Sequence, residues 1–220
     1  MNIQSAITKG TDILKDKSIL SAKLDTEILM AKALDKNREY IILNNDKVLS
    51  EKNLEYFKKL IQQRTTKKPI AYLLNTKFFW DSEFYVNDNT LIPRPDTEVV
   101  IEEVLRLTKI KNKMNILDIG VGSGCILLTI LKEKKNFYGT GIDISKKTLD
   151  ICRINAKKLN VEQRTKFYKS DVDKFTQGKY DLIVSNPPYI KSCDLKYLES
   201  DVINFEPKLA LDGGLDGLSE

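Results

Sequence analysis

The sequence has no histidine, few cysteines and no long apolar run, and each scarcity excludes a class of function. Without histidine, Ser-His-Asp and Cys-His catalysis are excluded, as is general-base catalysis by histidine. The three cysteines, Cys125, Cys152 and Cys193, form no CxxC pair, so we expect neither a metal site nor a disulfide framework. No stretch approaches the roughly 20 apolar residues of a membrane span, and residues 1–10 lack the apolar region of a secretory signal. We therefore expect a cytoplasmic protein in a reducing compartment, with no membrane partner.

The composition is that of a folded protein with a substantial core. Hydrophobic residues make up 41% and charged residues 30% of the 220 residues, which suits one large domain or a small domain joined to a medium one. The net charge of +5 is spread along the chain. It permits a nucleic-acid partner but is more typical of a lysine-rich solvated surface, so no direct nucleic-acid contact is required.

Residues 1–74 have the pattern of short amphipathic helices joined by polar turns. Leu24, Ile28 and Ala31 show the helical spacing, and Ser50 before Glu51 has the pattern of a helix N-cap. We expect Pro69 to close the last of these helices. The region contains no catalytic constellation and is interpreted as a small helical domain.

Residues 75–90 have the pattern of a β-hairpin. Aromatic residues 78–80 precede a turn at Asp81 and Ser82, and residues 84–86 follow it. We interpret the hairpin as the connector between two domains.

From residue 91 onward the pattern is that of an α/β domain. We predict helices at 99–107, 126–131 and 145–159, and strands at 115–119, 138–142, 165–168 and 180–184. This alternation predicts a parallel sheet with helices on both faces.

A glycine loop follows the first of these strands. Gly120, Gly122 and Gly124 allow a tight turn in which backbone N–H groups approach a ligand, and Asp143, 23 residues after Gly120, can accept hydrogen bonds from ribose hydroxyls. The dinucleotide spacing G-x-G-x-x-G fails because its third position is Cys125. The loop with Asp118 before it resembles motif I of class I methyltransferases, which bind S-adenosylmethionine. By that resemblance the cofactor residues are Gly120, Val121, Gly122, Ser123, Gly124, Asp143, Asp171, Val172 and Asn186.

The tetrapeptide Asn186-Pro187-Pro188-Tyr189 follows the last predicted strand, at the sheet edge where α/β proteins bind ligands. A planar NH₂ group is a poor nucleophile because its lone pair is delocalised. The Asn186 side-chain oxygen and the Pro187 carbonyl could each accept one of its N–H groups, and Tyr189 could stack on its plane. The tetrapeptide is similar to the motif of amino-methyltransferases that act on adenine, guanine or glutamine amides. It identifies the acceptor chemistry and leaves the substrate open.

Two further segments, 91–98 (Leu-Ile-Pro-Arg-Pro-Asp-Thr-Glu) and 205–218 (Phe-Glu-Pro-Lys-Leu-Ala-Leu-Asp-Gly-Gly-Leu-Asp-Gly-Leu), narrow the choice. With the helical domain before them, they resemble the bacterial release factor glutamine methyltransferase family over nearly all of the chain. The resemblance implies a helical domain of residues 1–74 that recognises the substrate, a hairpin connector of residues 75–90 and a partial class I methyltransferase core of residues 91–220. It implies that the substrate is the glutamine of the Gly-Gly-Gln loop in class 1 peptide-chain release factors. The catalytic residues would be Asn186, Pro187, Pro188 and Tyr189, with Arg94 and Thr97 lining the cofactor pocket.

Alternatives to this interpretation remain. A sister family methylates a ribosomal-protein glutamine, although segment 92–98 favours the release factor branch. An adenine or guanine methyltransferase would share the tetrapeptide, but it would need a concentrated basic groove, and only small basic clusters occur at 109–113 and 132–135. A third possibility is a binding module without turnover.

The number of predicted core strands is also lower than the resemblance implies. Class I methyltransferase cores normally have seven strands, and only four are predicted here, so the sequence has the pattern of a C-terminally truncated core. An apolar strand edge would then be exposed. We expect this 220-residue form to be poorly stable in isolation, which places its activity in question.

Overall fold

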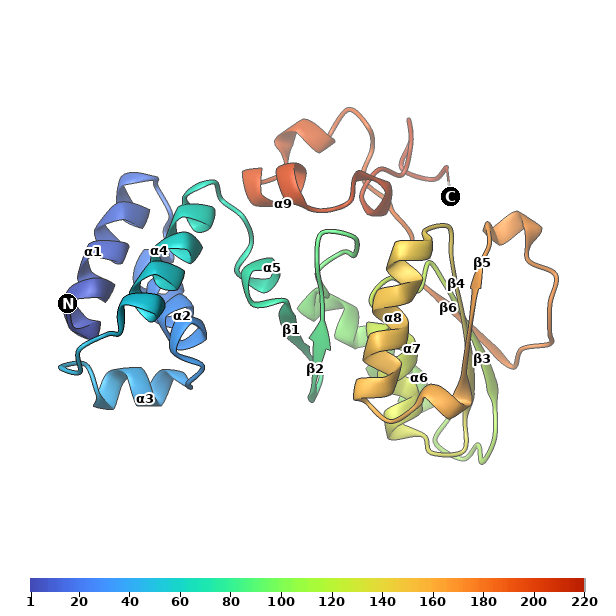
Figure 1. The fold of residues 1–220 in the computed structure, drawn as a ribbon. Helices are drawn as coiled ribbons and strands as arrows, with labels where there is room; N and C mark the ends of the chain where they lie inside the picture. The colour runs from blue at the N-terminus through green and yellow to red at the C-terminus, as the bar shows by residue number, and fades with distance from the viewer. Residues whose placement is uncertain (220) are drawn as a thin grey trace. The chain divides into compact units, whose positions relative to one another are not determined.

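A computed structural model describes residues 1–219, which divide into two units (Figure 1). The first unit comprises Met1–Leu74 with Ser200–Phe205, and the second comprises Asn75–Glu199 with the residues that follow Phe205. No helix within the described residues is long and apolar enough to cross a membrane.

The first unit is helical. Its elements are α1 (Ile3–Asp16), α2 (Ala22–Leu34), α3 (Arg38–Leu43), α4 (Glu51–Thr65), α5 (Ile70–Leu74) and α9 (Ser200–Phe205). The predicted N-cap is confirmed, because the Ser50 side chain accepts a hydrogen bond from the N–H of Asn53 at 3.2 Å. A buried ion pair joins α2 to α4, with Arg64 Nε 2.7 Å from Asp25 Oδ2.

The prediction that Pro69 closes a helix is wrong. Helix α4 already ends at Thr65, and the carbonyl of Pro69 accepts hydrogen bonds from Tyr72 and Leu73 in the first turn of α5. Proline suits this position, because the first residues of a helix need no intrahelical N–H donor.

The hairpin belongs to the second unit. It consists of β1 (Thr76–Phe79) and β2 (Ser82–Tyr85), paired in antiparallel register. Its turn lies at Trp80 and Asp81, one residue earlier than predicted, and Trp80 adopts a left-handed conformation with φ of 56°. Phe79 and Phe84 meet edge to face and pack into the main core of this unit, so the hairpin is part of that core.

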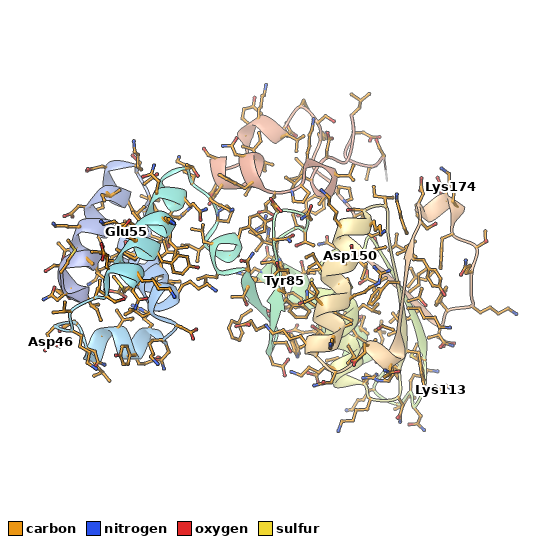
Figure 2. All side chains as sticks on the ribbon, in the orientation of Figure 1. Asp46, Glu55, Tyr85, Lys113, Asp150 and Lys174 are labelled. Carbon is orange, nitrogen blue, oxygen red and sulfur yellow. The ribbon has the colours of Figure 1, made fainter. Side chains whose placement is uncertain are left out.

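The sheet of the second unit has four parallel strands, as predicted. They are β3 (Asn115–Ile119), β4 (Tyr138–Asp143), β5 (Thr165–Lys169) and β6 (Leu182–Ser185), in the order β5-β4-β3-β6. The order reverses beside β3, and this switch point opens a crevice at the carboxyl ends of the strands. In Figure 2, Lys174 lies in the turn beyond the carboxyl end of β5, and Lys113 lies just before the amino end of β3, at the opposite ends of the strands.

The helices of this unit are α6 (Glu98–Leu107), α7 (Cys125–Glu133) and α8 (Lys146–Lys158). The sequence predicts helices on both faces, whereas these three share one core on one face of the sheet. Because β3, β4 and β5 follow one another in a single direction, right-handed crossovers place their helices on the same side. The connection from β5 to β6 contains only the short 3-10 turn Val172–Lys174, and Ile183 on the other face is 58% exposed.

Candidate active site

The glycine loop turns sharply at the end of β3. The φ values of its three glycines, which residues other than glycine rarely adopt, are 70° at Gly120, 56° at Gly122 and 84° at Gly124. The N–H groups of Gly120 and Val121 donate to the carbonyl of Ile142, so the loop is held against the end of β4. A Cβ on Gly120 would meet nothing within 4 Å, which leaves this backbone open to a ligand.

Gly124 has a structural role beside its predicted contact with the cofactor, which stays a prediction. It is the N-cap of α7, and a Cβ there would lie 2.6 Å from both Cys152 Sγ and Leu128 Cδ1. Close packing between α7 and α8 therefore accounts for this glycine, and it does not line the cavity described below.

Asp143 ends β4 and faces the glycine loop. Its carboxylate accepts hydrogen bonds from the N–H of Ser145 at 2.9 Å and from the N–H of Gly122 at 3.2 Å. Burial raises the pKa of Asp143 above its ordinary value, and these two N–H groups partly offset the rise. The carboxylate is thus fixed at the point where the ribose of a nucleoside cofactor would need an acceptor.

A cavity of about 460 Å³ lies at the carboxyl ends of the parallel strands. It brings together most of the residues predicted from the sequence: Arg94, Thr97, Gly120, Val121, Gly122, Ser123, Asp143, Asp171, Val172, Asn186, Pro187 and Pro188. Asp118, Gly124 and Tyr189 do not line it. The two halves of the predicted site therefore share one cavity.

The tetrapeptide enters this cavity directly from β6. Ser185 pairs with Ile119 across the sheet, and its hydroxyl donates to the Ile119 carbonyl at 2.9 Å, so Asn186 emerges beside the glycine loop. Within residues 1–219 the Asn186 side chain makes no hydrogen bond, which leaves its amide available to a substrate. Tyr189 is 69% exposed, so its stacking on a substrate stays a prediction.

The sequence did not single out Glu206, which is buried between two segments that line the cavity, those of Arg94 and Pro207. Its carboxylate is buried, accepts a hydrogen bond from the Ile92 N–H at 3.1 Å and pairs with the Arg94 guanidinium at 2.5 Å. The hydrogen bond and the ion pair join the segment before α6 to Glu206, and the next residue, Pro207, lines the cavity. The only sequence signal was an acidic residue beside proline in segment 205–218.

Asp118 is buried behind the glycine loop. Its carboxyl accepts a hydrogen bond from the N–H of Leu127, in the first turn of α7, at 3.3 Å. Burial raises the pKa of Asp118 to about 8, and the negative charge of Asp143 adds to the rise. Asp118 therefore joins the end of β3 to the first turn of α7.

This raised pKa predicts a pH-dependent stability. Between about pH 4 and about pH 8 the unfolded chain has lost the Asp118 proton and the folded chain retains it, so the free energy of unfolding should fall as pH rises. One such group contributes a slope of at most about 1.4 kcal/mol per pH unit. Urea unfolding followed by the fluorescence of Trp80, the single tryptophan, measures it. In Asp118→Asn the slope should be shallower, and equal slopes in the two proteins would refute this assignment.

Two family descriptions match the chain. "PrmC N-terminal domain" matches residues 5–74, and "Methyltransferase small domain" matches residues 97–204. The hairpin lies in the interval between the two matches, residues 75–96.

Curated relatives match across both regions. The release factor glutamine methyltransferase of Leptospira interrogans is 39% identical over 96% of this chain and 75% of its own length. That of Buchnera aphidicola is 39% identical over 100% of this chain and 78% of its own length.

A solved structure supports the fold. The catalytic domain of hMettl16, in complex with an RNA hairpin of the MAT2A 3′UTR, has a TM-score of 0.51 and 19% identity, covering 62% of this chain and 52% of that one. At this identity the likeness supports the methyltransferase fold alone.

Proposed function

Because the chain belongs to the release factor glutamine methyltransferase family, we propose that it transfers a methyl group from S-adenosylmethionine to the side-chain amide nitrogen of a release factor glutamine. The observation that carries the proposal is the shared cavity. The Asn-Pro-Pro segment that follows β6 and the glycine loop that follows β3 line it together, at the ends of two paired strands. A methyl donor and an amide acceptor can therefore lie next to each other.

The cavity fits the cofactor. The open backbone of Gly120 and Gly122 would receive the methionine end, and the fixed carboxylate of Asp143 would accept hydrogen bonds from the ribose hydroxyls. Asp171 and Val172, which follow β5, would lie beside the adenine. When bound, S-adenosylmethionine supplies an electrophilic methyl group on a sulfonium.

The tetrapeptide would bind and orient the acceptor. The Asn186 side-chain oxygen and the Pro187 carbonyl each accept one N–H of the glutamine amide, which turns the nitrogen toward the methyl group. Accepting these hydrogen bonds also stabilises the positive charge that develops on the nitrogen as it attacks. Tyr189 is exposed, follows the cavity-lining Pro188 and would pack on the planar amide. The work of these residues is positioning and electrostatics, for which no histidine is needed.

The proposed acceptor is the glutamine of the Gly-Gly-Gln loop of a class 1 release factor. Flanking glycines would let a narrow loop enter a cavity of this size. The helical unit would hold the rest of the release factor. In its support, α3 and the loop after it expose the apolar side chains of Ile42, Leu43 and Val48.

Methyl-labelled S-adenosylmethionine tests the proposal. The acceptors are a class 1 release factor and the same protein with its loop changed to Gly-Gly-Ala. We expect label on the first and none on the second, with mass spectrometry placing the methyl group on the glutamine. Label on neither acceptor, under conditions where the chain binds the cofactor, would refute the proposed substrate. Label on total RNA in place of the release factor would favour a nucleobase acceptor.

A further inference from the structure

The glycine-rich segment 211–217 packs against the chain that leaves the tetrapeptide. Ile190 donates its N–H to the carbonyl of Leu211 at 3.2 Å, and Gly213 donates its N–H to the carbonyl of Ile190 at 2.8 Å. Ile190 and Asp212 form an isolated parallel bridge. The segment therefore adds a short strand-like pairing immediately after Tyr189.

A second group of hydrogen bonds locks this pairing two residues later. The Ser192 hydroxyl donates to Asp212 Oδ1 at 2.6 Å, and the Ser192 N–H donates to the carbonyl of Gly214 at 2.8 Å. The N–H of Gly214 in turn donates to Asp212 Oδ1 at 3.1 Å. Asp212 thus organises both sides of the contact.

Two glycines in the segment lie directly against the tetrapeptide backbone. A Cβ on Gly213 would lie 2.8 Å from the carbonyl oxygen of Pro188 and 2.9 Å from Tyr189 Cα, and a Cβ on Gly217 would lie 2.6 Å from the carbonyl oxygen of Tyr189. These neighbours are main-chain atoms, so the contacts could be relieved only by a shift of the tetrapeptide backbone or of the backbone of segment 211–217.

The tetrapeptide needs support of this kind. Pro187 and Pro188 have no N–H groups, so the two residues cannot hold themselves in place by donating backbone hydrogen bonds. The restraint on their carbonyl directions must come from packing behind them and from pairing just beyond them. Segment 211–217 provides both.

We propose that Gly213 and Gly217 are positioning residues for methyl transfer, which set the direction of the tetrapeptide carbonyls by backing Pro188 and Tyr189. The inference rests on the proposed function and assigns a role to a segment that does not otherwise take part in it. Neither glycine lines the cavity, so their effect on the reaction passes through the tetrapeptide. A misplacement of about 1 Å in a reacting group can slow an enzyme by roughly 10²-fold, so a small backbone shift here should be measurable.

Gly213→Ala is the first test. Gly213 has no positive φ, so the added methyl group acts through its contacts and not through backbone strain. These contacts are with Pro188 and Tyr189 and, at 2.9 Å, with the carbonyl oxygen of Gly217. We expect the single-turnover rate of methyl transfer to the release factor to fall about tenfold or more. The dissociation constant of S-adenosylmethionine and the thermal unfolding midpoint should stay close to those of the wild type.

Gly217→Ala and Gly214→Ala form a matched pair. Both glycines have a φ of 83°, so the two substitutions carry the same backbone strain. A Cβ on Gly214 meets the side chain of Ser219, whereas a Cβ on Gly217 meets the Tyr189 carbonyl. We expect Gly217→Ala to transfer methyl groups about tenfold more slowly than Gly214→Ala.

The outcomes separate this inference from the function on which it rests. Wild-type rates in Gly213→Ala and Gly217→Ala, with an active wild type, would overturn the positioning role alone. Loss of cofactor binding in parallel with the rate would also overturn it, because the segment would then serve folding in general. A wild-type chain that binds cofactor but labels no release factor would overturn the proposed function and this inference together.

Discussion

Asn186→Ala should slow methyl transfer by roughly 10²–10³-fold and have a much smaller effect on the affinity for S-adenosylmethionine. The Asn186 side chain emerges from β6 into the cavity, and no other group within residues 1–219 engages it. Its oxygen can therefore accept a hydrogen bond from the substrate amide without breaking an existing one. Alanine removes that acceptor at the point where positive charge develops on the nitrogen.

Single-turnover rates with saturating cofactor and release factor measure the effect, and calorimetry measures cofactor binding. Asp143→Ala provides the contrasting variant. It removes a carboxylate held by Gly122 and Ser145, so it should weaken cofactor affinity and leave the rate at saturation much less affected. Normal turnover in Asn186→Ala would show that the proposed amide clamp is wrong.

The parts of this site that sequence could predict are those that stand together in the chain. The glycine loop follows one apolar strand, and the tetrapeptide follows another. Since the carboxyl ends of parallel strands meet at one edge of a sheet, their proximity followed from the strand assignment. The register that places Ile119 opposite Ser185 is consistent with this argument.

The parts that could not be predicted depend on contacts between distant segments. Glu206 reaches back to Ile92 and Arg94, more than 100 residues earlier, and no local periodicity encodes such a pairing. The spacing of Gly124 matches the motif and predicts contact with a ligand, but it does not indicate the packing role. Its packing against Cys152 of the next helix became visible only in three dimensions.

The two local predictions that were wrong, at Pro69 and at the hairpin turn, have similar causes. Proline is compatible with both the end and the start of a helix, and the capping bonds to Pro69 decide for the start. The hairpin turn includes Trp80, a residue type that rarely adopts a positive φ. Glu98 accepts a hydrogen bond from the Trp80 N–H at 2.8 Å, so a tertiary contact holds this conformation against the local preference.

Asn155 of α8 provides the second large effect, on stability. Its side chain is fully buried and makes three hydrogen bonds to main-chain groups. The amide donates to the carbonyls of Tyr85 and Ser123, both at 2.9 Å, and its oxygen accepts from the N–H of Tyr85 at 2.7 Å. One side chain thus joins the hairpin to the glycine loop. Figure 2 labels Tyr85 on the hairpin and Asp150, which lies on the same helix as Asn155.

Asn155→Ala should lower the free energy of unfolding of the second unit by about 3–5 kcal/mol. The substitution leaves one buried main-chain group, at Ser123, and two partly buried ones, at Tyr85, without these partners. Each unsatisfied buried group costs about 1–3 kcal/mol, partly relieved where water can enter. Urea unfolding followed by Trp80 fluorescence reports on this unit, because Trp80 lies in it. Lys157→Ala, an exposed position on the same helix, should change stability by no more than about 0.5 kcal/mol.

Asn155→Ala should also bind S-adenosylmethionine more weakly, because the Ser123 carbonyl that Asn155 holds belongs to the loop that lines the cavity. The two effects have one origin, and they should appear together. A variant that lost stability but kept full cofactor affinity would show that the hydrogen bond to Ser123 does not fix the loop. The hydrogen bonds to Tyr85 would then account for the whole effect.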